Sequence, residues 1–292
     1  MPEVSMTTIN DWADRGRMLQ IDLDDPATPR PHCVGLSRMG GARVTAAACS
    51  AWVVLRGHAW VECKEGRFRL RRGEWMVFER DSVPVLHTDE TGLAVGVLLR
   101  APDLKLLEQI ADNVLYPGRG RLPAGELRVA LQLWRAARAG SGSEALRPVL
   151  LHIARAQREL ATRVQLCPGR SRSRKRQVFG RMQRARLYLE GHNDRVVRIG
   201  ELADLTNFSS WYFSKAFQSL YEESPQALSA RLRLERAAEL LTSTSMTVGE
   251  VAASCGFDNC CSFARAFRAR HGTTATAYRA RHERYASERA AA

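Results

Sequence analysis

The sequence has no long apolar run and no regular cysteine framework. Its longest apolar stretch, around residues 46–55, is interrupted by Cys49 and Ser50 and is far shorter than the roughly 20 residues of a membrane-spanning helix. The N-terminal segment MPEVSMTTINDWADRGR lacks a basic start followed by an apolar core, so we expect no signal peptide and no membrane partner. Seven irregularly spaced cysteines favour a reducing, cytoplasmic location over a disulfide-bonded protein.

Lysine is scarce, although the chain is strongly basic. Lys and Arg together number 44 against 31 Asp and Glu, a net charge of +13, and only four of the 44 are lysine. Residues 1–166 hold 23 basic and 19 acidic side chains, whereas residues 167–292 hold 21 and 12. This balance favours a polyanionic partner, either nucleic acid or an anionic membrane surface, bound by the C-terminal part.

The N-terminal part predicts short strands followed by helices. Residues 1–32 are polar and irregular, but residues 33–99 contain short apolar or alternating runs separated by glycines, such as RFRLRRG at 67–73, which predict a small sandwich or barrel. Apolar spacing of three and four predicts helices over 103–116 and 125–139. In the second of these, Leu127, Leu131 and Trp134 form an apolar stripe, for which packing on its own domain and dimerisation are both open. Residues 167–176 (CPGRSRSRKR) predict a basic, solvated linker.

The C-terminal part contains an approximate internal duplication. Residues 199–203 (IGELA) match residues 248–252 (VGEVA), and the phenylalanines at 208, 213 and 217 match those at 257, 263 and 267, with one residue of slippage at the turn. Each copy predicts a short helix, a turn and a second helix with two phenylalanines facing the core.

The turn residues support this reading of the duplication. Gly256 and Asn207 stand between the helices of the two copies, where a left-handed backbone conformation is expected. Ser209 and Asp258 are the predicted N-caps of the second helices. Two short helices joined by a tight turn form a helix-turn-helix unit, whose second helix enters the major groove of DNA.

These motifs make residues 178–280 resemble the AraC/XylS family of bacterial transcription regulators. The segment 230–241 (ARLRLERAAELL) resembles that family's connecting helix, and Glu222 stands where the family commonly has glycine. The resemblance implies an α+β protein of two domains. We therefore expect a cupin-like β-barrel with following helices over 1–166, a linker over 167–176, and an all-α domain with two helix-turn-helix units over 177–292.

The resemblance also implies a site and partners. Its recognition helices would lie in successive major grooves about 34 Å apart. Carried over by position, the residues that face DNA are Trp211, Ser214, Lys215, Asn259, Cys260, Cys261, Ser262 and Arg265. Arg265 can donate two hydrogen bonds to guanine, or be one of many solvated arginines; Trp211 can contact a thymine methyl group, or pack on the domain core. The family further implies double-stranded DNA, RNA polymerase and a second copy of the chain as partners, and an activating role.

Residues 33–99 also resemble a cupin-type sensor domain that holds a small-molecule effector. The candidate effector-binding residues are Trp52, His58, Trp60, Trp75 and His87. Because metal-binding cupins carry a His-x-His pair and a glutamate, and both histidines here are isolated, we expect no metal and no cofactor. Cys255, Cys260 and Cys261 have no zinc-ligand spacing and are expected to be packing or groove-facing residues, with thiol sensing as the alternative.

Two other functions remain open at this stage. The chain could be an effector-free regulator controlled by its abundance or by a protein partner. It could also be a cupin-fold enzyme with a DNA-binding appendage, although no metal triad, nucleophile–base pair or phosphate-binding loop is readable in the sequence. We therefore predict a DNA-binding regulator and not an enzyme.

Overall fold

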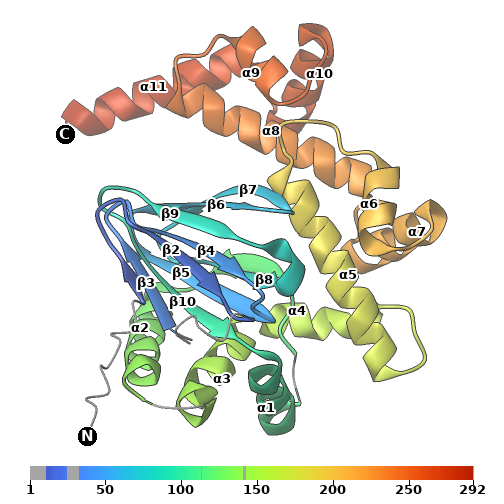
Figure 1. Ribbon diagram of the computed structural model, residues 1–292. Helices are drawn as coiled ribbons and strands as arrows, with labels where there is room; N and C mark the ends of the chain where they lie inside the picture. The colour runs from blue at the N-terminus through green and yellow to red at the C-terminus, as the bar shows by residue number, and fades with distance from the viewer. Residues whose placement is uncertain (1–10, 25–32, 113, 141–142, 292) are drawn as a thin grey trace, which may run out of the picture. The chain divides into compact units, whose positions relative to one another are not determined.

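The computed structural model describes residues 11–24, 33–112, 114–140 and 143–291. The chain divides into two compact units between Leu187 and Tyr188. The first unit is rich in strands and the second is helical (Figure 1), so the two-part α+β organisation predicted from the sequence is confirmed. Within the described residues no helix is long and apolar enough to span a membrane.

The strands of the first unit form two separate sheets. Six strands form the sheet ordered β1-β3-β10-β5-β8-β11, here called sheet A, and five form the sheet ordered β2-β4-β9-β6-β7, here called sheet B. The strands of sheet A are β1 (Trp12–Ala13), β3 (Cys33–Ser37), β10 (Leu93–Leu99), β5 (Cys49–Arg56), β8 (Glu74–Glu79) and β11 (Gly118–Arg121). Those of sheet B are β2 (Met18–Asp22), β4 (Gly41–Thr45), β9 (Val85–Thr88), β6 (His58–Cys63) and β7 (Gly66–Arg71).

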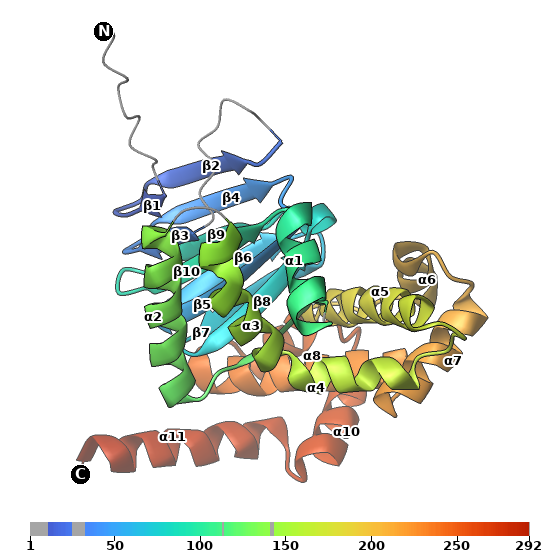
Figure 2. The ribbon, with the colours of Figure 1, turned by 90° about the horizontal axis from the view of Figure 1, so that it is seen from below.

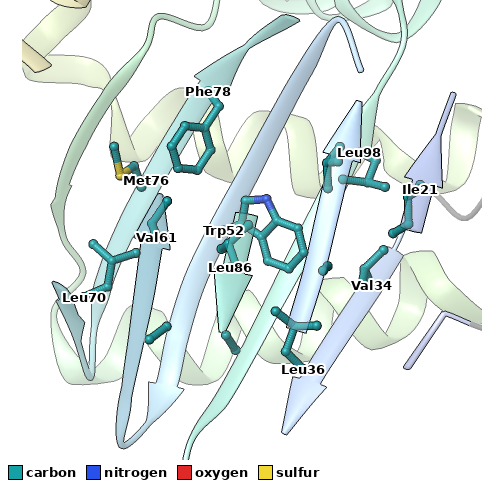
Figure 3. Close-up of a cluster of buried hydrophobic side chains, with 14 of the residues drawn as sticks. Ile21, Val34, Leu36, Trp52, Val61, Leu70, Met76, Phe78, Leu86 and Leu98 are labelled. Carbon is teal, nitrogen blue, oxygen red and sulfur yellow. The ribbon is translucent and has the colours of Figure 1, made fainter. Parts of the chain in front are cut away.

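This arrangement is a two-layer sandwich, and the expected closed barrel is wrong. The side chains of the two sheets meet in one buried cluster that includes Leu36, Trp52, Phe78 and Leu86 (Figure 3). In β7, Phe68 and Leu70 face this core and the arginines between them are exposed, as the alternating pattern predicts. Gly96 lies under the indole ring of Trp52, where an added Cβ would be 2.5 Å from the ring, so only glycine fits there.

The irregular structure expected for residues 1–32 is also wrong in part. Residues 1–10 and 25–32 lie outside the described residues. Between them, β1 and β2 pair in parallel with β3 and β4. Pairing with β3 and β4 stabilises these short edge strands, and Trp12 also packs edge-on against Trp134 at 6.1 Å. Such long-range contacts leave little local signal in the sequence.

Helices cover the outer face of sheet A (Figure 2). They are α1 (Ala101–Ala111), α2 (Ala124–Ala139), α3 (Arg147–Ala156) and α4 (Arg158–Arg163), with 3₁₀ turns at Arg80–Ser82, Ser143–Leu146 and Val164–Leu166. In the stripe on α2, Leu127 is buried and Leu131 and Trp134 pack in the cluster against this sheet. The Trp134 indole donates a hydrogen bond to the Gly96 carbonyl at 2.9 Å. The stripe is therefore used inside its own unit.

The basic run at 167–176 is not a solvated linker throughout, because helix α5 (Arg172–Gly191) begins inside it. Arg172 forms an ion pair with Asp112, and Arg176 contacts Glu108 and Asp112 at 3.0 Å each. Further along α5, Phe179 is fully buried and meets Tyr116 edge-on at 4.7 Å. The first turns of α5 have no apolar pattern of their own, and these tertiary contacts stabilise them as a helix.

The second unit contains two pairs of short helices joined by a long helix. They are α6 (Ile199–Thr206) and α7 (Ser210–Tyr221), the long α8 (Pro225–Ser243), and α9 (Val248–Ser254) and α10 (Cys260–His271), followed by α11 (Ala275–Ala291) (Figure 1). The predicted core phenylalanines are confirmed: Phe213, Phe217, Phe263 and Phe267 are all fully buried. The two copies of the duplication thus pack in the same way.

Candidate nucleic-acid interface

The turn in each helix pair has the backbone conformation that its sequence predicts. Asn207 ends α6 at φ 53°, and Gly256 follows α9 at φ 69°. A Cβ at position 256 would lie 2.7 Å from the Cα of Arg195, so both the conformation and the close backbone contact require glycine at this position. The turns therefore set a fixed path into α7 and α10.

The second helix of each pair begins at a side-chain cap. Ser209 accepts a hydrogen bond from the Tyr212 amide at 3.3 Å, as predicted. In the second pair the cap is Asn259, which accepts from the Ser262 amide at 2.8 Å, so the prediction of Asp258 is wrong by one residue. Both Asp and Asn are good N-caps. The one-residue offset between the two aligned copies therefore lies before the N-cap of the second helix.

The first helix of each pair is fixed by a glutamate in its first turn. Glu201 accepts from the Arg198 amide at 3.0 Å and forms an ion pair with Arg195 at 2.7 Å. The hydrogen bond from Arg195 lowers the pKa of Glu201 to about 2. In the second copy, Glu250 and Thr247 cap one another through their backbone amides at 3.2 and 2.7 Å. The repeated glutamate is thus a structural residue.

The exposed face of α7 carries Trp211 and Lys215, one turn apart. Trp211 is 71% exposed, which excludes the alternative that it packs on the domain core. Lys215 is exposed, and Ser214 between them is half-buried and donates its hydroxyl to the Ser210 carbonyl at 2.9 Å. The ring of Trp211 and the ammonium group of Lys215 are thus both accessible on this face.

The exposed face of α10 carries Cys261 and Arg265 at the same spacing. Both are exposed, as are Asn259 and Cys260 at the start of the helix, whereas Ser262 is half-buried. The Asn259 side chain and the Ser262 hydroxyl are used within the cap. Of the residues predicted here, Cys260, Cys261 and Arg265 remain available to a partner.

The next residue on each face, Gln218 on α7 and Arg268 on α10, was not among the DNA-facing residues predicted from the sequence. Both are exposed and continue the spacing of three and four residues along the helix. That spacing was the available signal. We define the stripe Trp211, Lys215 and Gln218 as the α7 face, and the stripe Cys261, Arg265 and Arg268 as the α10 face.

Many of the other arginines of the unit are paired within the fold. Arg231 contacts Glu223 and Glu235 at 3.0 Å. Arg195, Arg236, Arg270 and Arg279 contact acidic, amide or carbonyl groups. Among the described residues, in contrast, the side chains of Lys215, Arg265 and Arg268 have no hydrogen-bond or ion-pair partner. The α7 and α10 faces thus present cations that the fold itself does not use.

The cysteines of the second unit fall into two environments. Cys255 is fully buried, and burial raises the pKa of its thiol to about 11, which makes it unreactive. Cys260 and Cys261 are exposed on α10. Within the described part of the chain there is no group of three or more His, Cys, Asp or Glu residues placed to hold a metal ion.

The structure separates the five candidate effector-binding residues of the first unit. Trp52 lies in the core between the sheets, whereas Trp75 packs on the other face of sheet A, under the helices. Trp60 is 47% exposed on sheet B, where it pairs across strands with His87. His58 contacts Asp89 at 3.0 Å. Trp52 and Trp75 both line a cavity between sheet A and helices α2 and α3, whereas His58, Trp60 and His87 lie on strands of sheet B and do not line it.

Comparison with known proteins identifies the helical unit. The family described as "Helix-turn-helix domain" matches residues 202–281, from within α6 into α11. The C-terminal unit carries an AraC-type helix-turn-helix domain. The match confirms the resemblance predicted from the sequence for these residues.

Two proteins named as transcriptional regulators are similar to part of this chain. The probable transcriptional regulator LumQ of Photobacterium leiognathi is 30% identical over 31% of this chain and 37% of its own length. The regulator GbdR of Pseudomonas aeruginosa is 35% identical over 27% of this chain and 22% of its own. The chain therefore aligns with well under half of the length of these relatives.

Solved structures are also similar to part of this chain. A probable AraC family regulator from Rhodopseudomonas palustris is 36% identical and covers 35% of this chain and 96% of its own, with a TM-score of 0.33. The DNA-binding domain of AdpA, solved with a target DNA, is 26% identical over 36% of this chain and 94% of its own, with a TM-score of 0.34.

Proposed function

We propose that this protein is a sequence-specific DNA-binding transcription regulator. Its α7 and α10 faces would enter successive major grooves on one side of the duplex, about 34 Å apart. The observation that carries this proposal is the pair of exposed faces, each on the second helix of a capped helix pair, with cations that are free of partners within the described chain. The AraC-type domain and the names of the relatives support it.

The side chains of the two faces suggest different roles. Arg265 would donate two parallel hydrogen bonds to the O6 and N7 atoms of a guanine, a contact worth about 1–3 kcal/mol of discrimination against other bases. Lys215 and Arg268 would contact a guanine edge or a phosphate group. The Trp211 ring would pack on a thymine methyl group or on the sugar backbone.

The wider assembly follows from the same proposal. A homodimer would place four such helices on two half-sites, and contact with RNA polymerase would make the protein an activator. The sequence places the domain boundary at residues 167–176, whereas the two compact units of the structure divide within α5, between Leu187 and Tyr188.

Salt-titrated binding of the full chain to its own upstream DNA tests the proposal. The variants are Arg265→Ala and Lys215→Ala, and the matched control is Arg128→Ala, an exposed arginine on α2. Wild type and control should prefer one site over competitor DNA, and Arg265→Ala should lose that preference while keeping weak, salt-sensitive binding. Equal affinity of all four proteins for any DNA would contradict base reading by Arg265.

A further inference from the structure

Two adjoining cavities lie at the edge of sheet A, where β8 and β11 meet helices α2, α3 and α4. The outer cavity has a volume of about 400 Å³ and the inner one of about 60 Å³. Both are lined by Trp75, Leu122, His152 and Ala156. Because these four residues line both, the two cavities are neighbours that share one wall.

The outer cavity has an excess of positive charge. Four arginines line it, at 119, 121, 155 and 158, against two glutamates, Glu126 and Glu159. Arg155 contacts Glu126 at 3.5 Å, and Arg119 contacts Glu74 at 3.6 Å. Arg121 reaches only the Arg72 carbonyl, at 3.5 Å, and Arg158 has no partner within the described residues. Two guanidinium groups are therefore available to an anion.

The inner cavity is apolar. It lies between sheet A and helices α2 and α3, and apart from His152 its lining consists of aliphatic and tryptophan side chains, including Val77, Val97 and Ile153. One water molecule needs about 10–15 Å³ of cavity volume, so about 60 Å³ accepts about four to six non-hydrogen atoms of a ligand. Apolar cavities of this kind stay dry and accept apolar groups.

His152 stands at the boundary between the two cavities. Its side chain is 11% exposed, and its Nδ1 is 3.6 Å from a carboxylate oxygen of Glu126. The other ring nitrogen, Nε2, is buried and makes no hydrogen bond to any described residue. A buried polar atom without a partner is destabilising, and a polar group of a bound ligand at this boundary would satisfy it.

We propose that the two cavities form one binding site for a monocarboxylate that carries an aromatic ring or a short branched chain. The carboxylate contacts Arg121 and Arg158 in the outer cavity, and the apolar group enters the inner cavity past Trp75 and His152. This places the effector site under α2 and α3, where it includes Trp52 and Trp75 of the residues predicted from the sequence but not His58, Trp60 or His87. The binding site itself is independent of the proposed function; the further consequence, that the ligand controls DNA binding, rests on it.

Calorimetric titration of the full chain with 3-phenylpropanoate tests the binding site directly. The matched ligands are 3-phenylpropanamide, which lacks the charge, and propanoate, which lacks the ring. We expect saturable binding of 3-phenylpropanoate and at least about tenfold weaker binding of the other two. The amide loses the charge-assisted hydrogen bonds to the arginines, and propanoate has no ring to bury in the inner cavity. Absence of saturable binding, or equal binding of the amide, would overturn the proposal.

Variants locate the site. Arg158→Gln and Arg121→Gln should each weaken binding of 3-phenylpropanoate about tenfold or more, and both positions are exposed, so the fold should tolerate the change. Ala130→Leu, which fills the inner cavity, should abolish binding. Arg128→Gln, on α2 but outside both cavities, is the control. Unchanged affinity in the first two variants would place binding elsewhere and refute the site.

Failure of this inference is distinguishable from failure of the proposed function. The DNA titration without ligand tests the α7 and α10 faces alone. Calorimetry without DNA tests the cavities alone.

Discussion

Arg233 on α8 should determine the stability of the second helix pair. Its guanidinium group donates to the Gly256 carbonyl at 2.8 Å and lies over the Phe257 ring at 4.5 Å. Burial lowers the pKa of Arg233, so the group is partly withdrawn from water. The long helix thereby holds the turn that leads into α10 and aims the α10 face.

The free energy at stake follows from these contacts. A hydrogen bond from a charged donor is worth about 1.5–3 kcal/mol, and a partly buried cation–π contact about 1–2 kcal/mol. Because one guanidinium group makes both contacts and has itself lost hydration, we expect Arg233→Ala to destabilise the α9–α10 pair by about 2–4 kcal/mol. That is a large share of the roughly 5–15 kcal/mol that stabilises a typical domain.

Hydrogen exchange of the full chain measures this effect locally. Buried amides of α10 should exchange about 30 to 700 times faster in Arg233→Ala, since each 1.4 kcal/mol corresponds to about tenfold. The control is Arg268→Ala, which removes an equal charge from an exposed position on α10 and should leave exchange unchanged while weakening DNA binding. Wild-type protection in Arg233→Ala would refute the reasoning.

Three further predictions concern backbone strain, pH and base contact. Glu222 and Gly272 end α7 and α10 with φ of 58° and 70°, so Glu222→Gly should raise the free energy of unfolding by about 1 kcal/mol and Gly272→Ala should lower it by about the same amount, measured by chemical denaturation. Burial raises the pKa of Glu79 from 4.5 to about 7, so between these values the folded protein keeps a proton that the unfolded chain has lost. The stability of the first unit should therefore fall as pH rises through this range; Glu79→Gln should remove that slope, and an identical slope in the variant would contradict the assignment. If Trp211 contacts a thymine methyl group, replacing thymine by uracil in the DNA site should weaken binding by wild type but not by Trp211→Ala.

Much of the second unit could be predicted from the sequence because the duplication supplies two independent observations of one pattern. Phe213 and Phe263 are buried and Asn207 and Gly256 are left-handed, as the aligned copies indicate. The cap at Asn259 was misplaced because Asp258 beside it has equivalent capping chemistry. A local pattern cannot choose between two adjacent good caps; the packing of the turn decides.

The first unit was less predictable for a different reason. In β6 the residues alternate between two faces, and we expected His58 and Trp60 to bind an effector. Instead Ala59 and Val61 face the core, while Trp60 is exposed beside Arg69, whose guanidinium carbon lies 5.9 Å from the ring. Alternation gives the two faces of a strand, but the partner of each face depends on sheet pairing that lies far away in the sequence.

The charge of the α7 and α10 faces also depends on contacts between residues that lie far apart in the sequence. From the sequence, Arg265 could contact guanine or be one of many solvated arginines among the 40 in the chain, because nothing local distinguishes a paired guanidinium group from a free one. Arg231 and Arg270 are neutralised by Glu235, which lies four residues from one and 35 from the other along the chain. Only after such tertiary pairs are assigned do Lys215, Arg265 and Arg268 remain as unpaired cations on the two exposed helix faces. The net charge of the chain therefore indicates a polyanionic partner, whereas the fold determines which few side chains are left to bind it.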